Sequence, residues 1–259
     1  MPPWDSQQYL RFERERTLPC RELVRRLELE RPARIVDLGC GPGNSTAELA
    51  ARWPGAEISG VDSSPAMLEA ARASPLRAEW VLSDLRAFRP SGGFDLVFSN
   101  AALQWVPDHA LEVPRLWSWV RPKGALAFQV PAPGPERDRW TDPLEELLGE
   151  SSWRDRVASA PTPESVLSPG EYYRLLSGEA AQVELWDTLY VHVLRTPREV
   201  VEWAKGTALR PILERLPSDA VRDEFLARYA TAIEAAYPPE PDGRVLFPFL
   251  RRFVVAYRL

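Results

Sequence analysis

The stretch "IVDLGCGPGNSTAELA", residues 35–50, decides the fold that this sequence predicts. It passes from an apolar, β-branched run through alternate glycines into a pattern that is typical of a helix. Ser45 and Glu48 fit a capping box, which would start the helix directly after the glycines. A strand, a tight turn and a helix start in this order form a common nucleotide site, because the loop and the helix N-terminus offer backbone N–H groups to a ligand.

The spacing of the glycines bears on which nucleotide would bind. Gly39, Gly41 and Gly43 form G-x-G-x-G, whereas the dinucleotide fingerprint of dehydrogenases reads G-x-G-x-x-G. Asp37 stands inside the predicted strand, where a carboxylate would repel a pyrophosphate and attract an ammonium or a sulfonium. Such a turn can also serve only to pack a helix on a strand. The loop and the acid together favour S-adenosylmethionine.

Length and composition fit a single large domain. The chain has 259 residues, of which 45% are hydrophobic, enough for a substantial core. Its net charge of −5 gives no basic footprint for nucleic acid. Cys20 and Cys40 are too few for a disulfide framework, the charged opening residues do not fit a signal peptide, and no apolar run reaches the about 18 residues of a membrane span. We expect a cytoplasmic protein, a monomer by default, with neither a nucleic acid nor a membrane as partner.

Short apolar runs alternate with helical patterns, which indicates an α/β fold with a mostly parallel sheet covered by helices on both faces. The predicted strands span residues 34–38, 57–62, 78–83, 94–100, 124–130, 182–194 and 253–257. Helices are predicted over 135–178, together with Pro-rich loops, and over 197–236. We expect one domain over 1–259, with a helical cap over one end of the sheet. The sheet core would cover about 30–131, 180–195 and 246–259, and the cap about 1–22, 132–179 and 196–240.

Acidic residues mark the ends of the first three predicted strands. Asp62 ends "EISGVD" and Asp84 ends "EWVLSD", while Asp37 precedes the glycines. Carboxyl ends of parallel strands share one edge of the sheet, where ligands of this fold class bind, and Asp62 is placed to accept hydrogen bonds from ribose hydroxyls. Acidic residues are common in turns, so a single one would be weak evidence for a ligand site. Three in register with a glycine loop favour a ligand site.

Four motifs resemble the class I S-adenosylmethionine-dependent methyltransferases: "VDLGCGPGN", "GVDSSPAML", "SDLRAF" and "FDLVFSNAALQWVPDH". The whole chain is similar to the family of trans-aconitate 2-methyltransferases, through "WDSQQYLRFERERTLP", "WAKGTALRP" and the last strand. The resemblance implies a Rossmann-like, seven-stranded sheet whose last strand is antiparallel. It also implies methyl transfer from S-adenosylmethionine to a small polycarboxylate such as trans-aconitate, with release of S-adenosylhomocysteine.

The resemblance also implies roles for individual residues. Asp62 would hold the ribose of the cofactor, and Asp84 with the backbone of Leu85 would hold the adenine. Asn100 and Ala101 would lie under its methionyl chain. The cofactor-binding residues expected in this way are Asp37, Gly39, Gly41, Gly43, Asn44, Asp62, Ser63, Met67, Asp84, Leu85, Asn100 and Ala101.

The fourth predicted strand bears on the methyl acceptor. "FSNAALQWVPDH" lacks the two prolines that often follow the Asn or Asp of enzymes methylating amide or exocyclic amino nitrogens, which counts against DNA or glutamine as substrate. Trp105 and His109 follow this strand and are candidate substrate contacts, although core packing for Trp105 and a surface position for His109 are open alternatives. Tyr9 could close over the ligand or pack as a strap.

A carboxylate acceptor asks for positioning rather than for acid–base chemistry. It is ionised at pH 7, so no general base and no catalytic residue in that sense is expected. The spare carboxylates of a polycarboxylate need cations, and arginine binds them through a bidentate fork. Arg210, in the family stretch "TALRP", is the first candidate, and Arg16, Arg251 and Arg252 are further ones. No residue spacing indicates a metal site.

Three other functions stay open from the sequence. The enzyme class could hold with another small metabolite as acceptor. The protein could bind S-adenosylmethionine without turnover and regulate a partner. An NAD-dependent dehydrogenase is disfavoured by the glycine spacing.

Overall fold

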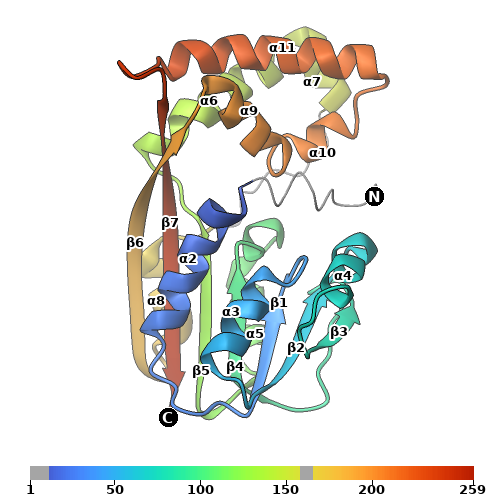
Figure 1. Cartoon of the computed structure of the whole chain (residues 1–259). Coiled ribbons are helices and arrows are strands. Elements are labelled where there is room, and N and C mark those ends of the chain that lie inside the picture. Colours follow the sequence, from blue (N-terminus) through green and yellow to red (C-terminus); the bar gives the residue numbers. More distant parts are fainter. Residues whose placement is uncertain (1–11, 158–165) are drawn as a thin grey trace.

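A central β-sheet organises the computed structural model, which describes residues 12–157 and 166–259 (Figure 1). Within these ranges the sheet has seven strands: β1 (Arg34–Leu38), β2 (Glu57–Asp62), β3 (Glu79–Leu82), β4 (Phe94–Asn100), β5 (Val120–Pro131), β6 (Ala180–Leu194) and β7 (Val245–Arg258). Their order is β3-β2-β1-β4-β5-β7-β6, and β7 runs antiparallel to β5 and to β6, whereas β1 to β5 are parallel. The predicted α/β class and the antiparallel last strand are confirmed.

The strand order reverses between β1 and β4, and this determines where a ligand can bind. The chain moves outward from β1 through β2 to β3, then returns to the other side of β1 as β4. Open α/β sheets bind ligands in the crevice at the carboxyl ends of the strands beside such a reversal. The glycine loop follows β1, and Asn100 ends β4, so both lie at that crevice.

Helices cover both faces of the sheet. The helices within the described residues are α2 (Glu13–Arg26), α3 (Asn44–Arg52), α4 (Pro65–Arg72), α5 (His109–Trp117), α6 (Pro135–Gly149), α7 (Ser151–Val157), α8 (Pro169–Leu176), α9 (Pro197–Lys205), α10 (Arg210–Leu213) and α11 (Asp219–Ala236), with a short 3-10 turn, η1 (Leu103–Trp105). Side chains alternate along a strand, so Ile35 packs with α2 and α3 on one face, while Val36 packs with α5 and α8 on the other.

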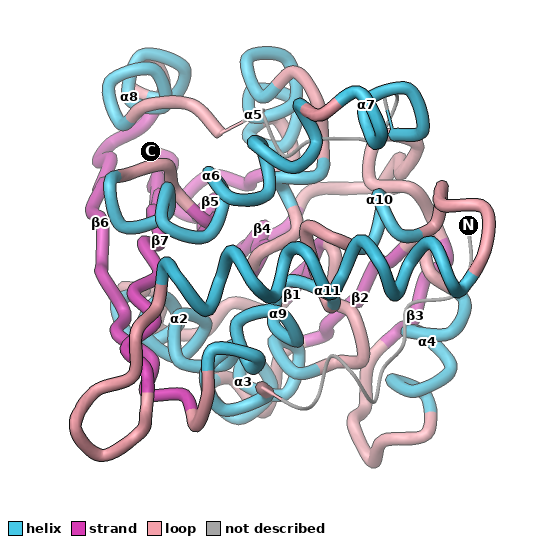
Figure 2. Tube along the Cα trace, turned by 90° about the horizontal axis from the view of Figure 1, so that it is seen from above, coloured by secondary structure: helices cyan, strands magenta, loops and turns pink. Residues whose placement is uncertain are grey.

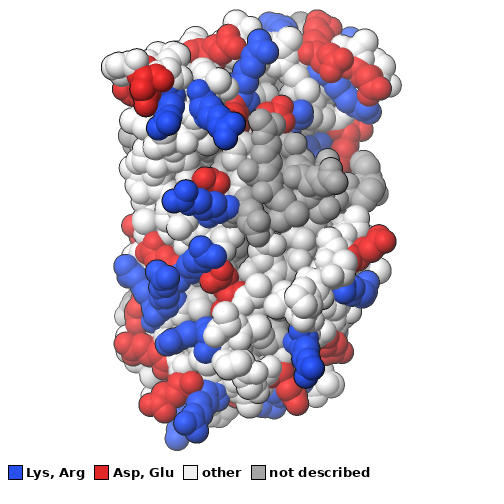
Figure 3. All heavy atoms as spheres, viewed as in Figure 1, with Lys and Arg blue, Asp and Glu red and all other residues white. Residues whose placement is uncertain are grey.

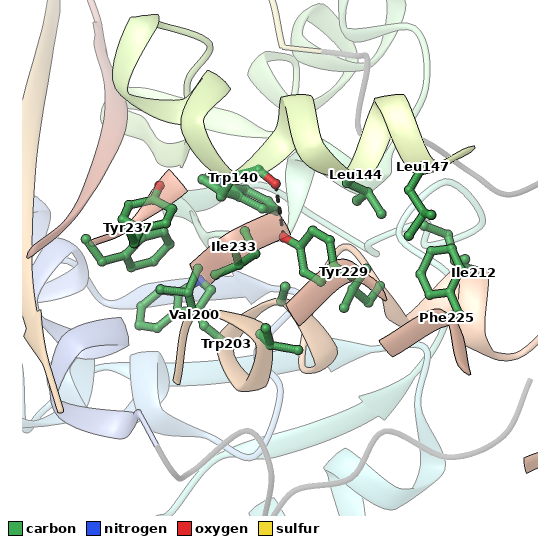
Figure 4. Packing of buried hydrophobic residues seen from close by; sticks show 14 of the residues in the cluster. Trp140, Leu144, Leu147, Val200, Trp203, Ile212, Phe225, Tyr229, Ile233 and Tyr237 are labelled. Carbon is green, nitrogen blue, oxygen red and sulfur yellow. Dashed lines mark hydrogen bonds between the residues drawn. The ribbon is translucent and has the colours of Figure 1, made fainter. Parts of the chain in front are cut away.

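Helices α6, α7, α9, α10 and α11 form a cap over the carboxyl end of the sheet, and this cap has a hydrophobic core of its own. Trp140, Trp203, Phe225 and Tyr229 are buried there, and the Tyr229 hydroxyl donates a hydrogen bond to the Trp140 carbonyl at 3.0 Å (Figure 4). Helix α11 lies across the top of this cap (Figure 2). The long strands β6 and β7 extend from the sheet up to the cap, and Phe247 of β7 belongs to the cap core (Figure 1).

Two helices that were expected in the cap lie against the sheet instead. Most of helix α2 falls within the predicted cap range 1–22 and α8 falls within 132–179, yet Cys20 of α2 and Leu176 of α8 are buried in the two cores of the sheet. The reason is that these apolar faces complete the layers on either side of β4 and β5. Glu22 also ties α2 to β6, because its carboxylate accepts hydrogen bonds from Trp186 Nε1 at 2.8 Å, Thr188 Oγ1 at 2.9 Å and the Tyr190 hydroxyl.

The described surface carries mixed charge. On the face shown in Figure 3, acidic and basic side chains are interspersed rather than gathered by sign. None of the helices formed by residues 12–157 and 166–259 has the length and apolar character needed to cross a bilayer.

Candidate cofactor and substrate site

The glycine loop is held between β2 and the segment that follows β4. Gly39 N and Cys40 N both donate hydrogen bonds to the Val61 carbonyl, at 2.8 and 3.1 Å. A Cβ built on Gly39, which has φ of 72°, would lie 2.1 Å from the Cβ of Ala102. A Cβ on Gly41, with φ of 55°, would meet no atom of the described residues within 4 Å. The loop is therefore pressed against its neighbour at Gly39 and open at Gly41, where a ligand could lie.

The capping box predicted from Ser45 and Glu48 is wrong, although the helix does start directly after the loop. The residue before α3 is Gly43, which caps the helix with no side chain. The Ser45 hydroxyl donates instead to Asp37 Oδ2 at 2.7 Å, and Glu48 pairs with Arg21 of α2 at 2.8 Å. A buried carboxylate needs hydrogen-bond donors more than a helix end near solvent needs an acceptor, so the hydroxyl turns inward.

Asp37 lies beneath the loop, and its side chain does not reach the ligand-binding edge of the sheet that the sequence predicted for the three acids. Its side chain is fully buried, and Oδ2 accepts hydrogen bonds from the hydroxyls of Ser45 and Thr46, both at 2.7 Å. The other oxygen, Oδ1, is buried and accepts none from the described residues. Burial raises the pKa of Asp37 to about 6, against the lowering effect of the two hydroxyl donors. The carboxylate is mostly ionised at pH 7 and places negative charge directly under the loop.

Asp62 is fixed at the edge of the sheet by backbone donors. Gly41 N donates to Oδ2 and Ser64 N donates to Oδ1, each at 2.9 Å. Burial raises the pKa of Asp62, and the backbone N–H groups of Ser64, Gly41 and Ser63 oppose that shift. A carboxylate offers about four lone-pair sites, so these backbone donors leave part of its capacity for a ligand. A pair of vicinal hydroxyls fits this arrangement. Of the neighbouring predicted residues, Ser63 is exposed and Met67 is buried in α4.

Asp84 is engaged by a neighbouring arginine. Arg86 Nε donates to its Oδ1 at 3.1 Å and Nη2 to its Oδ2 at 3.0 Å, and these bonds lower the pKa of Asp84. The carbonyl of Leu85 accepts a hydrogen bond from Arg115 Nη2 at 3.0 Å. Both residues follow the carboxyl end of β3, as predicted. The Asp84 side chain is exposed to solvent.

Gln129 of β5 is a site residue that the sequence reasoning missed. Its Nε2 donates to Asn100 Oδ1 at 2.7 Å, and its carbonyl accepts from Ala101 N at 3.0 Å. Ala101 has φ of 55°, so this backbone bond holds the residue in an unusual conformation at the crevice. The sequence did contain a signal. A glutamine inside the apolar run "ALAFQV" is expected to be buried, and a buried amide needs hydrogen-bond partners.

A pocket lies between α2, the glycine loop and the end of β4. Its lining consists of Arg16, Thr17, Cys20, Gly39, Cys40, Pro42, Asn44, Ser45 and Asn100. Arg16 is buried, its Nη2 donates to the Trp203 carbonyl of α9 at 3.4 Å, and its guanidinium lies 4.9 Å from the centre of the Trp203 ring. The pocket thus has the cation of Arg16 in its lining, and the buried carboxylate of Asp37 lies behind Ser45, which also lines it. These residues fit an amino acid group, which carries both signs.

The predicted substrate residues are not all brought to this crevice. His109 is buried, its Nδ1 lies 2.6 Å from the Tyr172 hydroxyl and its Nε2 lies 2.8 Å from the Leu103 carbonyl, so both ring nitrogens are occupied within the protein. Burial lowers the pKa of His109, and the ring serves packing of α5 on α8 rather than contact with a substrate. Trp105 is half-buried at the end of η1 and stays a candidate.

Arg210 and Tyr9 were also predicted to bind the substrate. Arg210 begins α10 in the cap, and its Nε donates to Glu214 Oε1 at 2.7 Å. Its substrate role stays a prediction. Tyr9 lies outside the described residues. Among residues 12–157 and 166–259, no three His, Cys, Asp or Glu side chains are grouped as a metal site would need.

Comparisons with known proteins agree with this geometry. Residues 35–124 match the model of a methyltransferase domain. The chain is similar along its whole length to trans-aconitate 2-methyltransferases from Azoarcus sp. (47% identity, 100% of each chain) and from Methylobacterium nodulans (45% identity, 100% of this chain and 99% of the relative). Haemonchus contortus phosphoethanolamine N-methyltransferase 2, solved with S-adenosylhomocysteine, has the same fold at a TM-score of 0.55 and 16% identity. The match covers 93% of this chain and 52% of that larger one.

Fold and glycine loop together define the protein as a class I methyltransferase. The full-length similarity is more specific than the domain match, because it extends through the cap. The chain belongs to the family of trans-aconitate 2-methyltransferases.

Substitution of the two loop glycines should separate steric contact from backbone conformation. In Gly41→Ala the left-handed backbone alone should lower the free energy of unfolding by about 1–2 kcal/mol. In Gly39→Ala the overlap with Ala102 should add about 1–3 kcal/mol to a similar backbone cost. Urea unfolding of both variants measures the difference. Equal stability of the two would contradict the close approach of the loop to Ala102.

Asp37 should leave a signature in the pH dependence of stability. Because its pKa is about 6 in the native state and lower in the unfolded chain, the native state binds more protons between these values. Its contribution to stability therefore falls as the pH rises through that window and is constant above it. Relative to Asp37→Asn, the wild type should lose about 1.5 kcal/mol between pH 5 and pH 7.5. Parallel pH profiles of the two proteins in urea unfolding would rule this out.

Proposed function

We propose that this protein transfers a methyl group from S-adenosylmethionine to a carboxylate of trans-aconitate, forming a methyl ester and S-adenosylhomocysteine. The observation that carries the proposal is the similarity to trans-aconitate 2-methyltransferases over the whole chain, cap included. The arrangement of charges at the crevice supports it, since each part of the donor has a matching group there.

Asp37, Asp62 and Arg16 supply three of the contacts that we propose for the cofactor. Asp62 would accept hydrogen bonds from both ribose hydroxyls through its remaining lone pairs. The open space beside Gly41 leaves room for the donor against the loop backbone. Arg16 would hold the carboxylate of the methionyl group in the pocket, with Asp37 beneath supplying attraction for the cationic end.

The other predicted contacts lie around these three. Gly39, Gly43 and Asn44 would border the methionyl group, with Asn100 and Ala101 beneath it. The remaining predicted contacts, which would border the nucleoside, are Ser63, Met67, Asp84 and Leu85.

Orientation is what the chain contributes to the reaction. When bound, the sulfonium of the cofactor supplies an electrophilic methyl group. The acceptor carboxylate is ionised at pH 7, so no side chain needs to remove a proton from it. The cap lies over the carboxyl end of the sheet and would exclude water, while its cations hold the acceptor in line. Orientation of this kind is worth about 7–11 kcal/mol.

We also infer the setting in which the protein works. The two cysteines, Cys20 and Cys40, are free and buried, which suits the reducing cytoplasm. The net charge of −5 and the interspersed charges of Figure 3 suit a small-molecule substrate and neither nucleic acid nor membrane. Residues 1–259 would act as one unit, and as a monomer.

Incubation of the purified protein with S-adenosylmethionine and trans-aconitate should yield the monomethyl ester and S-adenosylhomocysteine in equal amounts, detected by mass spectrometry. A panel of other acids, alcohols, phenols and amines provides the control for acceptor class. Esterification of a different acid alone would move the assignment to that acceptor. Binding of the cofactor with no turnover on any member would refute an enzymatic role.

Arg16→Gln should weaken binding of S-adenosylhomocysteine by about 10- to 100-fold, because a charge-assisted hydrogen bond to the carboxylate is lost. Affinity for 5′-methylthioadenosine, which has the same nucleoside and no amino acid group, should stay within about twofold. Calorimetry with both ligands measures this. Arg14→Gln, an exposed residue of the same helix, is the matched control. Equal loss for both ligands would refute a contact with the carboxylate, and an unchanged cofactor affinity with a raised KM for trans-aconitate would assign Arg16 to the substrate.

A further inference from the structure

The candidate arginines lie in different surroundings in the described part of the chain. Arg252 is committed to the sheet, because its Nε and Nη2 donate to the two carboxylate oxygens of Asp187 at 3.0 and 2.8 Å, and Nη1 donates to the Leu167 carbonyl at 2.8 Å. Arg210 forms an ion pair with Glu214 within the cap. Arg16 lines the pocket beside the glycine loop. Arg251 lies in β7, beside the aromatic ring of Phe249.

Register places Arg251 at the carboxyl edge of the sheet. In β7 it lies opposite Pro131, the last residue of β5. Two residues further along β7, Phe253 lies opposite Gln129, which in turn lies opposite Asn100 of β4. Side chains two apart on a strand share a face, so Arg251 lies on the face of Phe253, which packs with α2. It thus stands one step beyond the row of Asn100, toward the cap.

Aromatic rings of the cap hold the guanidinium of Arg251. Its Cζ lies 4.4 Å from the centre of the Phe249 ring, and only 5% of the residue is exposed. Phe249 packs against Trp203 with ring centres 5.5 Å apart, and Trp203 is the ring over which Arg16 lies. Two buried cations therefore rest on one aromatic cluster between the sheet edge and the cap.

Among the described residues, His192 and Tyr190 of β6 are titratable groups that lie near Arg251. Burial and then the charge of Arg251 lower the pKa of His192, in β6, to about 4, so this ring is neutral at pH 7. Burial raises the pKa of Tyr190, whose hydroxyl donates to Glu22.

We propose that Arg251 binds a carboxylate of the substrate that is not methylated, and so determines the preference for a polycarboxylate; this inference rests on the proposed function. A guanidinium that is buried against a ring is already largely removed from water, so it loses little freedom on binding a carboxylate through two parallel hydrogen bonds. An alcohol or amine acceptor would gain nothing from this arrangement.

The test compares a tricarboxylate with a dicarboxylate of similar shape. Arg251→Gln and Arg251→Lys are assayed with trans-aconitate and with trans-glutaconate, which lacks one carboxylate. Arg251→Gln should lower kcat/KM for trans-aconitate by about 10- to 100-fold, mainly through KM, and lower that for trans-glutaconate much less. Arg251→Lys keeps the charge and loses the fork, so its effect should lie between wild type and Arg251→Gln. Arg198→Gln, an exposed arginine of α9, is the matched control.

Two binding measurements keep this outcome distinct from a failure of the proposed function. Calorimetry with S-adenosylhomocysteine checks that the Arg251 variants still fold and bind the cofactor. Calorimetry with trans-aconitate, on protein saturated with S-adenosylhomocysteine, reports the acceptor site without turnover. Weaker trans-aconitate binding in Arg251→Gln supports the inference even if no ester forms. Unchanged tricarboxylate-to-dicarboxylate preference in both Arg251 variants, with wild-type turnover present, overturns it and leaves the proposed function intact.

Discussion

The close approach of Gly39 to Ala102 is the contact on which the rest of the site depends. It brings the loop after β1 against the segment after β4, and only a residue without a Cβ permits it. From this contact follow the left-handed backbone of the loop, the start of α3 directly behind it, and the position of Asn100 across the crevice. Gln129 supports the same point from the other side, because it bonds both the side chain of Asn100 and the backbone of Ala101.

Charge is layered about this loop. Asp37 lies below it, buried and held by two hydroxyls, and Asp62 lies beside it, held by backbone N–H groups. Arg16 lies above it, on the ring of Trp203. A donor that is cationic at sulfur, anionic at one end and polar at the ribose matches this layering more closely than a pyrophosphate would, since a phosphate would face the charge of Asp37.

Strand β7 connects this site to the cap. Phe253 and Val255 belong to one core of the sheet, whereas Phe247 and Phe249 belong to the core of the cap. One continuous strand therefore joins the cap core to the sheet core. Arg251 lies on this strand between the residues of the two cores. Helix α2 performs a similar role from the other end of the chain, because Glu22 fixes it to β6 while Arg16 reaches the cap.

The sequence by itself determined the class of fold and the location of the site. Short apolar runs, the glycine loop and acids at strand ends depend on local chemistry, so β1, β2 and β4 were predicted with the bounds that the structure has. Tertiary structure alone decided how individual side chains are used. Ser45 satisfies a buried carboxylate instead of a helix end, His109 is occupied by Tyr172 and Leu103, and α2 and α8 cover the sheet instead of the cap. Arg251 and Arg252 are neighbours in sequence, yet one faces the aromatic cluster and the other an aspartate, because a strand turns successive side chains to opposite faces and only the packing shows what each face meets.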